Sequence, residues 1–141
     1  MGEFKWSWVK ARYPRTDKFF LYYPNGRSAD AQVIDVCGRD GNAHATLIWN
    51  VCHSCRHGLI AKISIIPEWQ RQGLGRRLLM RALYDGPGYN WATTSQSPEG
   101  QPFFPAMARE SRAALTNNGQ VCDHIDLSNR HFPKPRLEYG I

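Results

Sequence analysis

Residues 63–83 read ISIIPEWQRQGLGRRLLMRAL and contain three local patterns in immediate succession. An apolar run ends at Pro67, a polar segment carries Gly73 and Gly75, and apolar residues then recur at positions 74, 78, 79, 82 and 83. This order predicts a strand, a loop and an amphipathic helix. The strand extends back over 59–66, and its nearly continuous apolar and β-branched content predicts burial on both faces, as in the middle of a mixed sheet.

The flanking sequence predicts more strands and a second helix. Period-two alternation and turn signals predict strands over 4–9, 19–23, 31–37, 44–51, 89–94 and 120–127. A second helix is predicted over 103–115, and the Pro-containing tail predicts an irregular or edge segment. Because a helix joins strand 59–66 to strand 89–94, these two strands should pair in parallel through a right-handed crossover.

Length and composition favour one domain over residues 1–141. The chain has 141 residues, 42% of them hydrophobic and 21% charged, as in globular proteins. Neither a membrane-span pattern nor a signal-peptide pattern is present in the sequence, which predicts a cytoplasmic protein without a membrane partner. The net charge of +6 favours polyanionic partners in general and leaves nucleic acid open as one of them.

The loop before the first predicted helix has the features of a phosphate-binding site. Glycine permits a positive φ and close approach of a ligand to the backbone, and the first N–H groups of a helix lack intrahelical partners. The helix dipole also favours an anion there, and Arg71, Arg76 and Arg77 add positive charge. A Gly-Lys-Ser/Thr sequence and a third glycine at position 78 are both absent, which excludes a Walker loop and a dinucleotide fingerprint. The alternative is a strand-to-helix corner that binds nothing.

The stretch from Leu59 to Leu83 resembles the acetyl-CoA motif of the GNAT superfamily of N-acetyltransferases. That motif consists of a strand, a proline, a Gln/Arg-rich loop with Gly-x-Gly, and a helix, and Ile63 to Arg76 match it in register. The resemblance implies an α/β (α+β) fold with a GNAT-like mixed, mostly antiparallel central sheet flanked by helices. It also implies acetyl-CoA as cosubstrate and an unidentified amine, either a small molecule or a protein, as acceptor.

The resemblance also implies two sets of contacts with acetyl-CoA. The backbone of Ile63, Ser64 and Ile65, where the family's strand carries a bulge, would pair with the pantetheine arm and polarise the thioester carbonyl. The pyrophosphate would be held by the backbone amides of Arg71, Gln72, Gly73, Leu74, Gly75 and Arg76. Strand 89–94 would diverge from strand 59–66 and leave a cleft for the arm.

Three departures from the family pattern concern catalysis. Residues 10–30 show no helical period, so the family's two helices between the first strands are expected to be reduced or lost. Phe104 stands where many members have a tyrosine that acts as an acid. Strands 59–66 and 89–94 contain neither Asp nor Glu to act as a general base. The remaining candidates for proton transfer are Glu99, Ser95 and Glu110.

A corner between two predicted strands carries Cys52, Cys55 and His57 at the spacing of zinc ligands. One Cys-x-x-Cys pair supplies only two ligands, and Cys122 with His124 could complete a site if their strand ends nearby. The alternative is a pair of buried cysteines and an exposed polar turn. Reduced thiols are expected in a cytoplasmic protein.

Three functions follow from these patterns. The first is an acetyl-CoA-dependent N-acetyltransferase that acetylates a primary amine by direct attack in a ternary complex. The second is a non-catalytic acyl-CoA-binding or regulatory module on the same fold, which the missing tyrosine and base favour. The third is a basic, zinc-stabilised module that interacts with nucleic acid, and it depends only on net charge and the Cys/His corner.

Overall fold

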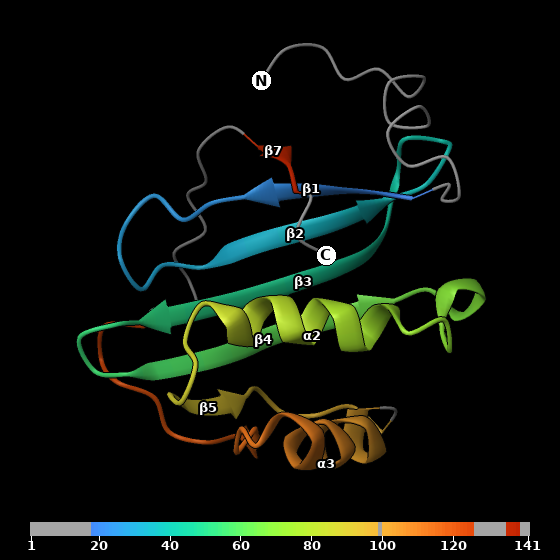
Figure 1. Cartoon of the computed structure of the whole chain (residues 1–141). Coiled ribbons are helices and arrows are strands. Elements are labelled where there is room, and N and C mark those ends of the chain that lie inside the picture. The colour runs from blue at the N-terminus through green and yellow to red at the C-terminus, as the bar shows by residue number, and fades with distance from the viewer. Residues whose placement is uncertain (1–17, 99, 126–134, 139–141) are drawn as a thin grey trace.

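A computed structural model of the chain describes residues 18–98, 100–125 and 135–138. The predicted strand over 4–9 therefore lies outside the described residues. Within them, seven strands form one sheet in the order β6-β5-β4-β3-β2-β1-β7, and two α-helices pack against it (Figure 1). None of the helices in the described part of the chain has the length and apolar character that crossing a membrane requires.

The first four strands form an antiparallel series. β1 (Phe19–Tyr23), β2 (Gln32–Cys37), β3 (Ala43–Cys52) and β4 (His57–Ile65) pair in chain order. Residues 24–31, all of which are described, contain no helix between β1 and β2. The expected reduction of the N-terminal helices is thus confirmed for this part of the chain.

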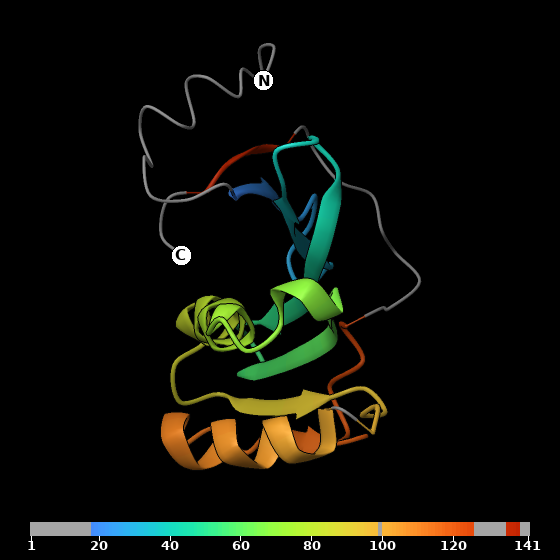
Figure 2. The same cartoon turned by 90° about the vertical axis from the view of Figure 1, so that its right-hand side faces the viewer.

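A right-handed crossover follows β4. A single 3-10 turn, η1 (Pro67–Trp69), leads into α2 (Leu74–Tyr84), and β5 (Asn90–Thr93) then pairs in parallel with β4. The apolar stripe of α2 is buried at Leu74, Leu78, Leu79, Ala82 and Leu83, the five positions that the helical spacing predicts. Figure 2 shows α2 end-on against one face of the twisted sheet.

Beyond β5 the sequence predictions hold in part. α3 (Gly100–Ser111) begins three residues before the start of the predicted range, 103–115, and ends four residues before its end. The strand predicted over 120–127 is wrong for the described residues 120–125, which have no strand; the strand that follows α3 is instead β6 (Thr116–Asn117), paired in parallel with β5. β7 (Arg136–Leu137) pairs with β1 as an edge strand.

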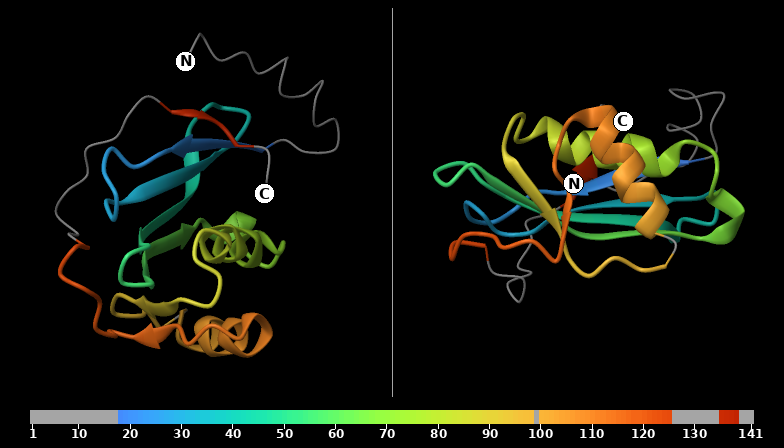
Figure 3. Two further views of the ribbon diagram at one scale, coloured as in Figure 1. Left: turned by 60° about the vertical axis from the view of Figure 1, so that its left-hand side comes forward. Right: turned by 90° about the horizontal axis from the view of Figure 1, so that it is seen from below.

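One hydrophobic core joins both helices to the sheet. Its members include Trp49 of β3, Ile60 of β4, Leu78 of α2 and Phe104 of α3. The result is the mixed, mostly antiparallel sheet flanked by helices that the sequence predicts, with α3 alongside β5 at one end of the sheet (Figures 1 and 3). This arrangement brings the loop before α2, the end of β5 and the start of α3 to one place.

Candidate functional site

The loop between β4 and α2 turns sharply at two residues. Arg71 and Gly73 both have positive φ, 63° and 77° respectively, and a side chain added at Gly73 would meet no atom within 4 Å. The Gln70 amide Nε2 donates to the carbonyl oxygen of Ile65 at 2.9 Å and ties the loop back to the strand end. Gly73 thus serves both the turn and the open space before the helix, since glycine adopts positive φ without steric cost.

The N-terminus of α2 presents backbone N–H groups that the helix itself does not use. The Arg77 N–H donates to the Gly73 carbonyl at 3.1 Å, so the amides of Leu74, Gly75 and Arg76 precede the first intrahelical bond. A side chain at Gly75 would lie 3.4 Å from both Ile65 and Phe103. This helix end therefore offers clustered donors and a favourable dipole to an anion.

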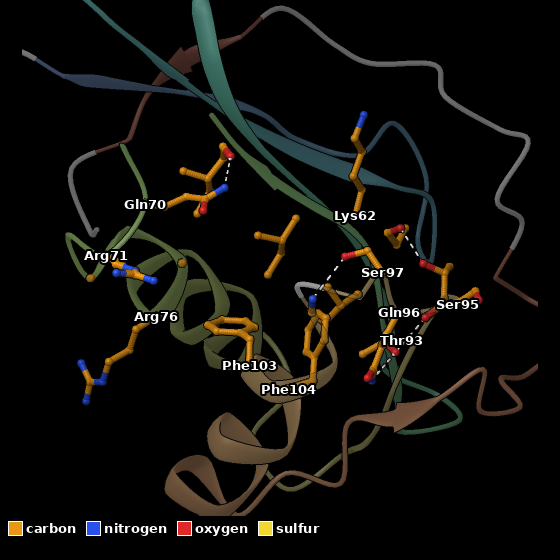
Figure 4. Close-up of a pocket in the computed structure, with 18 residues that line it drawn as sticks. Lys62, Gln70, Arg71, Arg76, Thr93, Ser95, Gln96, Ser97, Phe103 and Phe104 are labelled. Carbon is orange, nitrogen blue, oxygen red and sulfur yellow. Dashed lines mark hydrogen bonds between the residues drawn. The ribbon is translucent and has the colours of Figure 1, made fainter. Parts of the chain in front are cut away.

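The three arginines of this region do not behave alike. Arg71 and Arg76 border the same cavity (Figure 4). Arg76 is also paired with Glu110 of α3, with 2.6 Å between its guanidinium and the carboxylate. Arg77 instead lies over the ring of Phe20 in β1, 5.3 Å from its centroid. The positive charge next to the loop therefore comes from Arg71 and Arg76, whereas Arg77 faces the other strands.

Strands β4 and β5 separate at the level of this loop. Their paired positions end at Ile60 and Thr93, followed by two last contacts in which Thr94 donates to the carbonyls of Ile60 (3.1 Å) and Ala61 (2.8 Å). β4 continues to Ile65, so its last residues have no strand partner on the β5 side among the described strands. Peptide N–H and C=O groups on such an edge are available to a peptide-like ligand.

A register shift in β4 lies earlier than the resemblance implies. Ile48 pairs with Lys62 and Trp49 with Ile60, which leaves Ala61 as the extra residue of a bulge. The expectation of a bulge at residues 63–65 is therefore wrong by two residues. A bulge twists the strand and interrupts its ladder, and this one coincides with the point where β5 departs.

The loop, the free edge of β4, the end of β5 and the start of α3 enclose a cavity of about 630 Å³. Six of the nine residues for which the resemblance implies cofactor contacts line it: Ile63, Ile65, Arg71, Gly73, Gly75 and Arg76. Ser64 falls on the other face of β4, Leu74 is buried in the core, and the Gln72 side chain turns back to the Glu68 carbonyl. These three could contribute backbone groups only.

The candidates for proton transfer lie in different places. Ser95 lines the cavity just beyond β5, and its hydroxyl makes no hydrogen bond to any described residue (Figure 4). Glu110 is occupied by its ion pair with Arg76, and Glu99 lies outside the described residues. Phe104, which the sequence resemblance aligns with a tyrosine, lines the cavity and offers no proton.

The Cys/His corner gathers four possible ligands: the expectation holds for Cys52 and Cys55 and for the completing pair Cys122 and His124, and it fails for His57. Cys52 and Cys55 are joined by Cys122 and His124 from the segment after β6, with all four ligand atoms within 4.8 Å of one another. His57 is not a member; its Nδ1 is buried without a hydrogen-bond partner among the described residues. The Cys-x-His spacing at 122–124 is the signal that identifies the second pair, and the sequence could not show that it meets the first.

The aromatic wall of the cavity was not predicted. Phe103, at the start of α3, lies next to Gly75 and faces the loop (Figure 4). Helical periodicity in 103–115 predicts which residues share a helix face, but not that this helix end packs against the glycine loop. Lys62 of β4 also borders the cavity and was not predicted to do so. In the sequence it occupies an exposed position of an alternating strand, as surface lysines commonly do.

Comparison with known proteins returns solved structures only. No family model matches the sequence, and no curated protein does. A candidate acetyltransferase from Deinococcus radiodurans R1 aligns with 66% of this chain and 62% of its own, at 17% identity and a TM-score of 0.49. This chain therefore spans less than two thirds of that protein.

Two further structures are similar to this chain. A nourseothricin acetyltransferase aligns with 67% of this chain and 68% of its own, at 18% identity and a TM-score of 0.47. A candidate N-acetyltransferase from E. coli, YhhK, was solved bound to coenzyme A; it aligns with 76% of this chain and 84% of its own, at 16% identity and a TM-score of 0.43.

Proposed function

We propose that this chain is an acetyltransferase that takes acetyl-CoA into the cavity between β4 and β5 and transfers the acetyl group to a primary amine. One observation carries the proposal: the free edge of β4 leads directly into a glycine turn at the N-terminus of α2, and both line one cavity. The pantetheine arm of acetyl-CoA is peptide-like and can hydrogen-bond to a free strand edge, and the pyrophosphate that follows it can bind at a helix N-terminus. The motif over 59–83 supports the choice of acetyl-CoA.

Different residues would bind different parts of acetyl-CoA. The amides from Arg71 to Arg76 would surround the pyrophosphate, with the Arg71 and Arg76 side chains adding charge. The backbone of Ile63 and Ile65 would hydrogen-bond to the amides of the pantetheine arm, and the Phe103 ring would cover its apolar part. A backbone N–H near the bulge at Ala61 would polarise the thioester carbonyl, because a fixed donor there stabilises the charge that develops during attack.

The transfer itself moves one proton away from the amine nitrogen and one proton onto the departing thiolate. The amine nitrogen forms a bond to the acetyl carbon, the carbon–sulfur bond breaks, and the thiolate leaves. The amine must lose a proton before or during attack, and water is the acceptor that an open cavity provides when no carboxylate lines it. Among the described residues that line the cavity, Ser95 has a hydroxyl without any hydrogen bond, and it would hydrogen-bond the departing sulfur.

A second function, acyl-CoA binding without turnover, is favoured by two specific observations. Phe104, where the resemblance implies a tyrosine acid, presents an inert ring to the cavity, and Glu110 is paired with Arg76. Both functions require the same cosubstrate site. They differ only in whether thiol is released in the presence of an amine.

Thermal unfolding with and without acetyl-CoA tests the shared site. At a concentration a thousandfold above Kd, acetyl-CoA should stabilise the folded chain by about 4 kcal/mol. Each kcal/mol raises the Tm of a chain of this size by about 2–4 °C, so the expected rise in Tm is roughly 10 °C. Pantetheine, which lacks the pyrophosphate, is the matched control and should give a much smaller rise. An unchanged Tm at millimolar acetyl-CoA would refute both functions.

Thiol release across a panel of primary amines then separates the two functions. Amine-dependent release of CoA above the hydrolysis rate supports transfer, and Ser95→Ala should reduce it by about tenfold without changing the Tm rise. A full Tm rise with no release from any amine would favour the binding module.

A further inference from the structure

The four members of the Cys/His cluster come from two distant parts of the chain. Cys52 ends β3 and Cys55 follows in the turn to β4, whereas Cys122 and His124 belong to the irregular segment after β6. Figures 1 and 3 both show that segment, in orange, running beside the β3–β4 turn. Their donors are three thiol sulfurs and one imidazole nitrogen, all within 4.8 Å of one another.

The two distances from His124 to the sulfurs of Cys52 and Cys55 are close to those of tetrahedral coordination. The His124 Nδ1 lies 3.5 Å from the Cys52 sulfur and 3.3 Å from the Cys55 sulfur. With Zn–S of about 2.3 Å and Zn–N of about 2.0–2.1 Å, the S–N edge of a tetrahedron is about 3.6 Å. A zinc ion could therefore enter with side-chain movements of a few tenths of an ångström on these edges.

Three local features around the four side chains are typical of a metal site. Arg56, directly after Cys55, has a positive φ of 56°, which turns the chain between the ligand pair and β4. The Ser54 hydroxyl lies 3.3 Å from the Cys52 sulfur and could donate to it as an outer hydrogen bond. The burial of Cys52, with Cys55 and Cys122 only partly exposed, restricts solvent access to the sulfurs.

We propose that Cys52, Cys55, Cys122 and His124 form a structural zinc site of the Cys₃His type. Three thiolates and one imidazole in a tetrahedron are the donor set and geometry that zinc prefers, and four protein ligands leave no open position for catalysis. This site lies outside the proposed acetyl-CoA cavity and does not depend on the proposed function. None of its members lines that cavity.

The zinc would hold the segment that follows α3 and β6 against the β3–β4 turn. β6 has only two residues, and residues 118–125 have no regular structure to hold them. Cys52 and Cys122 do share a small apolar cluster with Leu59, Ala92 and Ile125, but it contains few large side chains. Zinc would close the loop between the β3–β4 turn and this segment and thereby restrict α3, which forms one wall of the cavity.

A disulfide between two of the three thiols is the competing state, and metal analysis of the purified full chain separates it from zinc. The protein should be prepared in reducing buffer with zinc, passed over a desalting column and measured by native mass spectrometry and by elemental analysis. We expect one zinc per chain, and the removal of this zinc by a chelator should lower the Tm by roughly 10 °C. A chain that binds no zinc, or whose mass shows a disulfide under these conditions, would overturn the proposal.

Cobalt substitution tests the ligand set without relying on variants that could fail to fold. Co²⁺ bound in place of zinc should show the intense visible bands of tetrahedral coordination together with thiolate-to-metal charge transfer in the near ultraviolet. Weak octahedral bands, or the absence of charge transfer, would contradict a Cys₃His site.

Paired variants then assign the ligands. Cys122→Ser and His124→Ala should each lower zinc affinity at least tenfold. His57→Asn and Cys37→Ala should keep one zinc per chain, because His57 lies outside the cluster and Cys37 is buried against Phe19. Loss of zinc from His57→Asn with retention in His124→Ala would refute the proposed set. Acetyl-CoA binding by the zinc-loaded chain is measured separately, so a failure of one site leaves the test of the other intact.

Discussion

At the scale of single residues, Gly75 combines two requirements. It lies in the first turn of α2, and a Cβ there would sit at ordinary contact distance, 3.4 Å, from Ile65 and Phe103. A methyl group is therefore tolerated sterically, whereas a longer or charged side chain must enter the cavity. The consequence is that size and charge at this one position can be separated experimentally.

Gly75→Glu should abolish the Tm rise produced by acetyl-CoA. The carboxylate would occupy the cavity and repel the pyrophosphate, while its position near a helix N-terminus favours the folded state. Thermal unfolding of the ligand-free variant should show a Tm within a few degrees of wild type. Gly75→Ala is the matched control and should keep most of the rise; an intact rise with Gly75→Glu would show that the pyrophosphate binds elsewhere.

Glu110 is the residue whose catalytic candidacy conflicts most clearly with its contacts. Its carboxylate accepts from Arg76 at 2.6 Å, and both side chains are about half exposed, so the pair contributes under about 1 kcal/mol to stability. We expect Glu110→Gln to leave the rate of acetyl transfer within about threefold of wild type and to tighten acetyl-CoA binding, because Arg76 gains freedom to contact phosphate. Steady-state kinetics would check this.

A loss of a hundredfold or more in kcat for Glu110→Gln would instead identify Glu110 as the general base. Arg76→Ala is the useful partner variant. It should weaken acetyl-CoA binding, which separates the effect of the arginine on the cosubstrate from any effect of the carboxylate on the chemistry.

At the scale of elements, the pairing of β4 with β5 holds the cavity open on one side only. Gly58 pairs with Trp91, and an added Cβ would lie 2.5 Å from the Trp91 ring. The ring cannot easily move, since it is 2% exposed and its Nε1 donates to the Gly86 carbonyl at 2.9 Å. Close packing at this end therefore anchors the strand pair that separates at the other end.

Gly58→Ala should lower the free energy of unfolding by about 1–3 kcal/mol, as expected for overpacking in a filled core. Urea denaturation would measure the effect, with Gly75→Ala as a control whose added methyl finds ordinary contacts. A midpoint equal to that of wild type would mean that β5 shifts to accommodate the methyl. The strand pairing would then be looser than the contacts indicate.

At the scale of the whole molecule, one buried thiol makes global stability depend on pH. Burial is the main cause that raises the pKa of Cys37 from its ordinary 9.0 to about 11, and Asp35 and Asp40 raise it further. Between these two values the unfolded chain loses the proton while the folded chain keeps it. The free energy of unfolding therefore falls as pH rises from about 9 to 11, and the contribution is constant below pH 9.

The expected size of this effect is at most about 3 kcal/mol over the interval, because one pKa unit corresponds to about 1.4 kcal/mol and Cys37 is 3% exposed. Urea denaturation of wild type and Cys37→Ala at several pH values would measure it as the difference between the two curves. The curves should approach each other as pH rises. Parallel curves from pH 8.5 to 11 would show that Cys37 does not titrate in this way.

The local sequence was sufficient for the elements whose signal is periodic and continuous. The stripe of α2 and the alternation and turns of β1 to β4 place these elements within one or two residues of where they lie. Side-chain spacing sets which face an element must bury, so these predictions need no knowledge of the remainder of the chain. The prediction of a strand over 120–127 failed for residues 120–125, which alternate in sequence, because β6 and not this segment pairs with the edge of β5.

The strand, the glycine turn and the helix that follow one another over 59–84 could therefore be predicted, because neighbouring residues specify each of them. What contacts this unit depends on the tertiary packing: β5 departs at Ala61, Phe103 and Glu110 of α3 lie against the start of α2, and Cys122 and His124 reach the β3–β4 turn. Each of these contacts joins residues far apart in the chain. Their distance is set by how the elements pack, which no local pattern records.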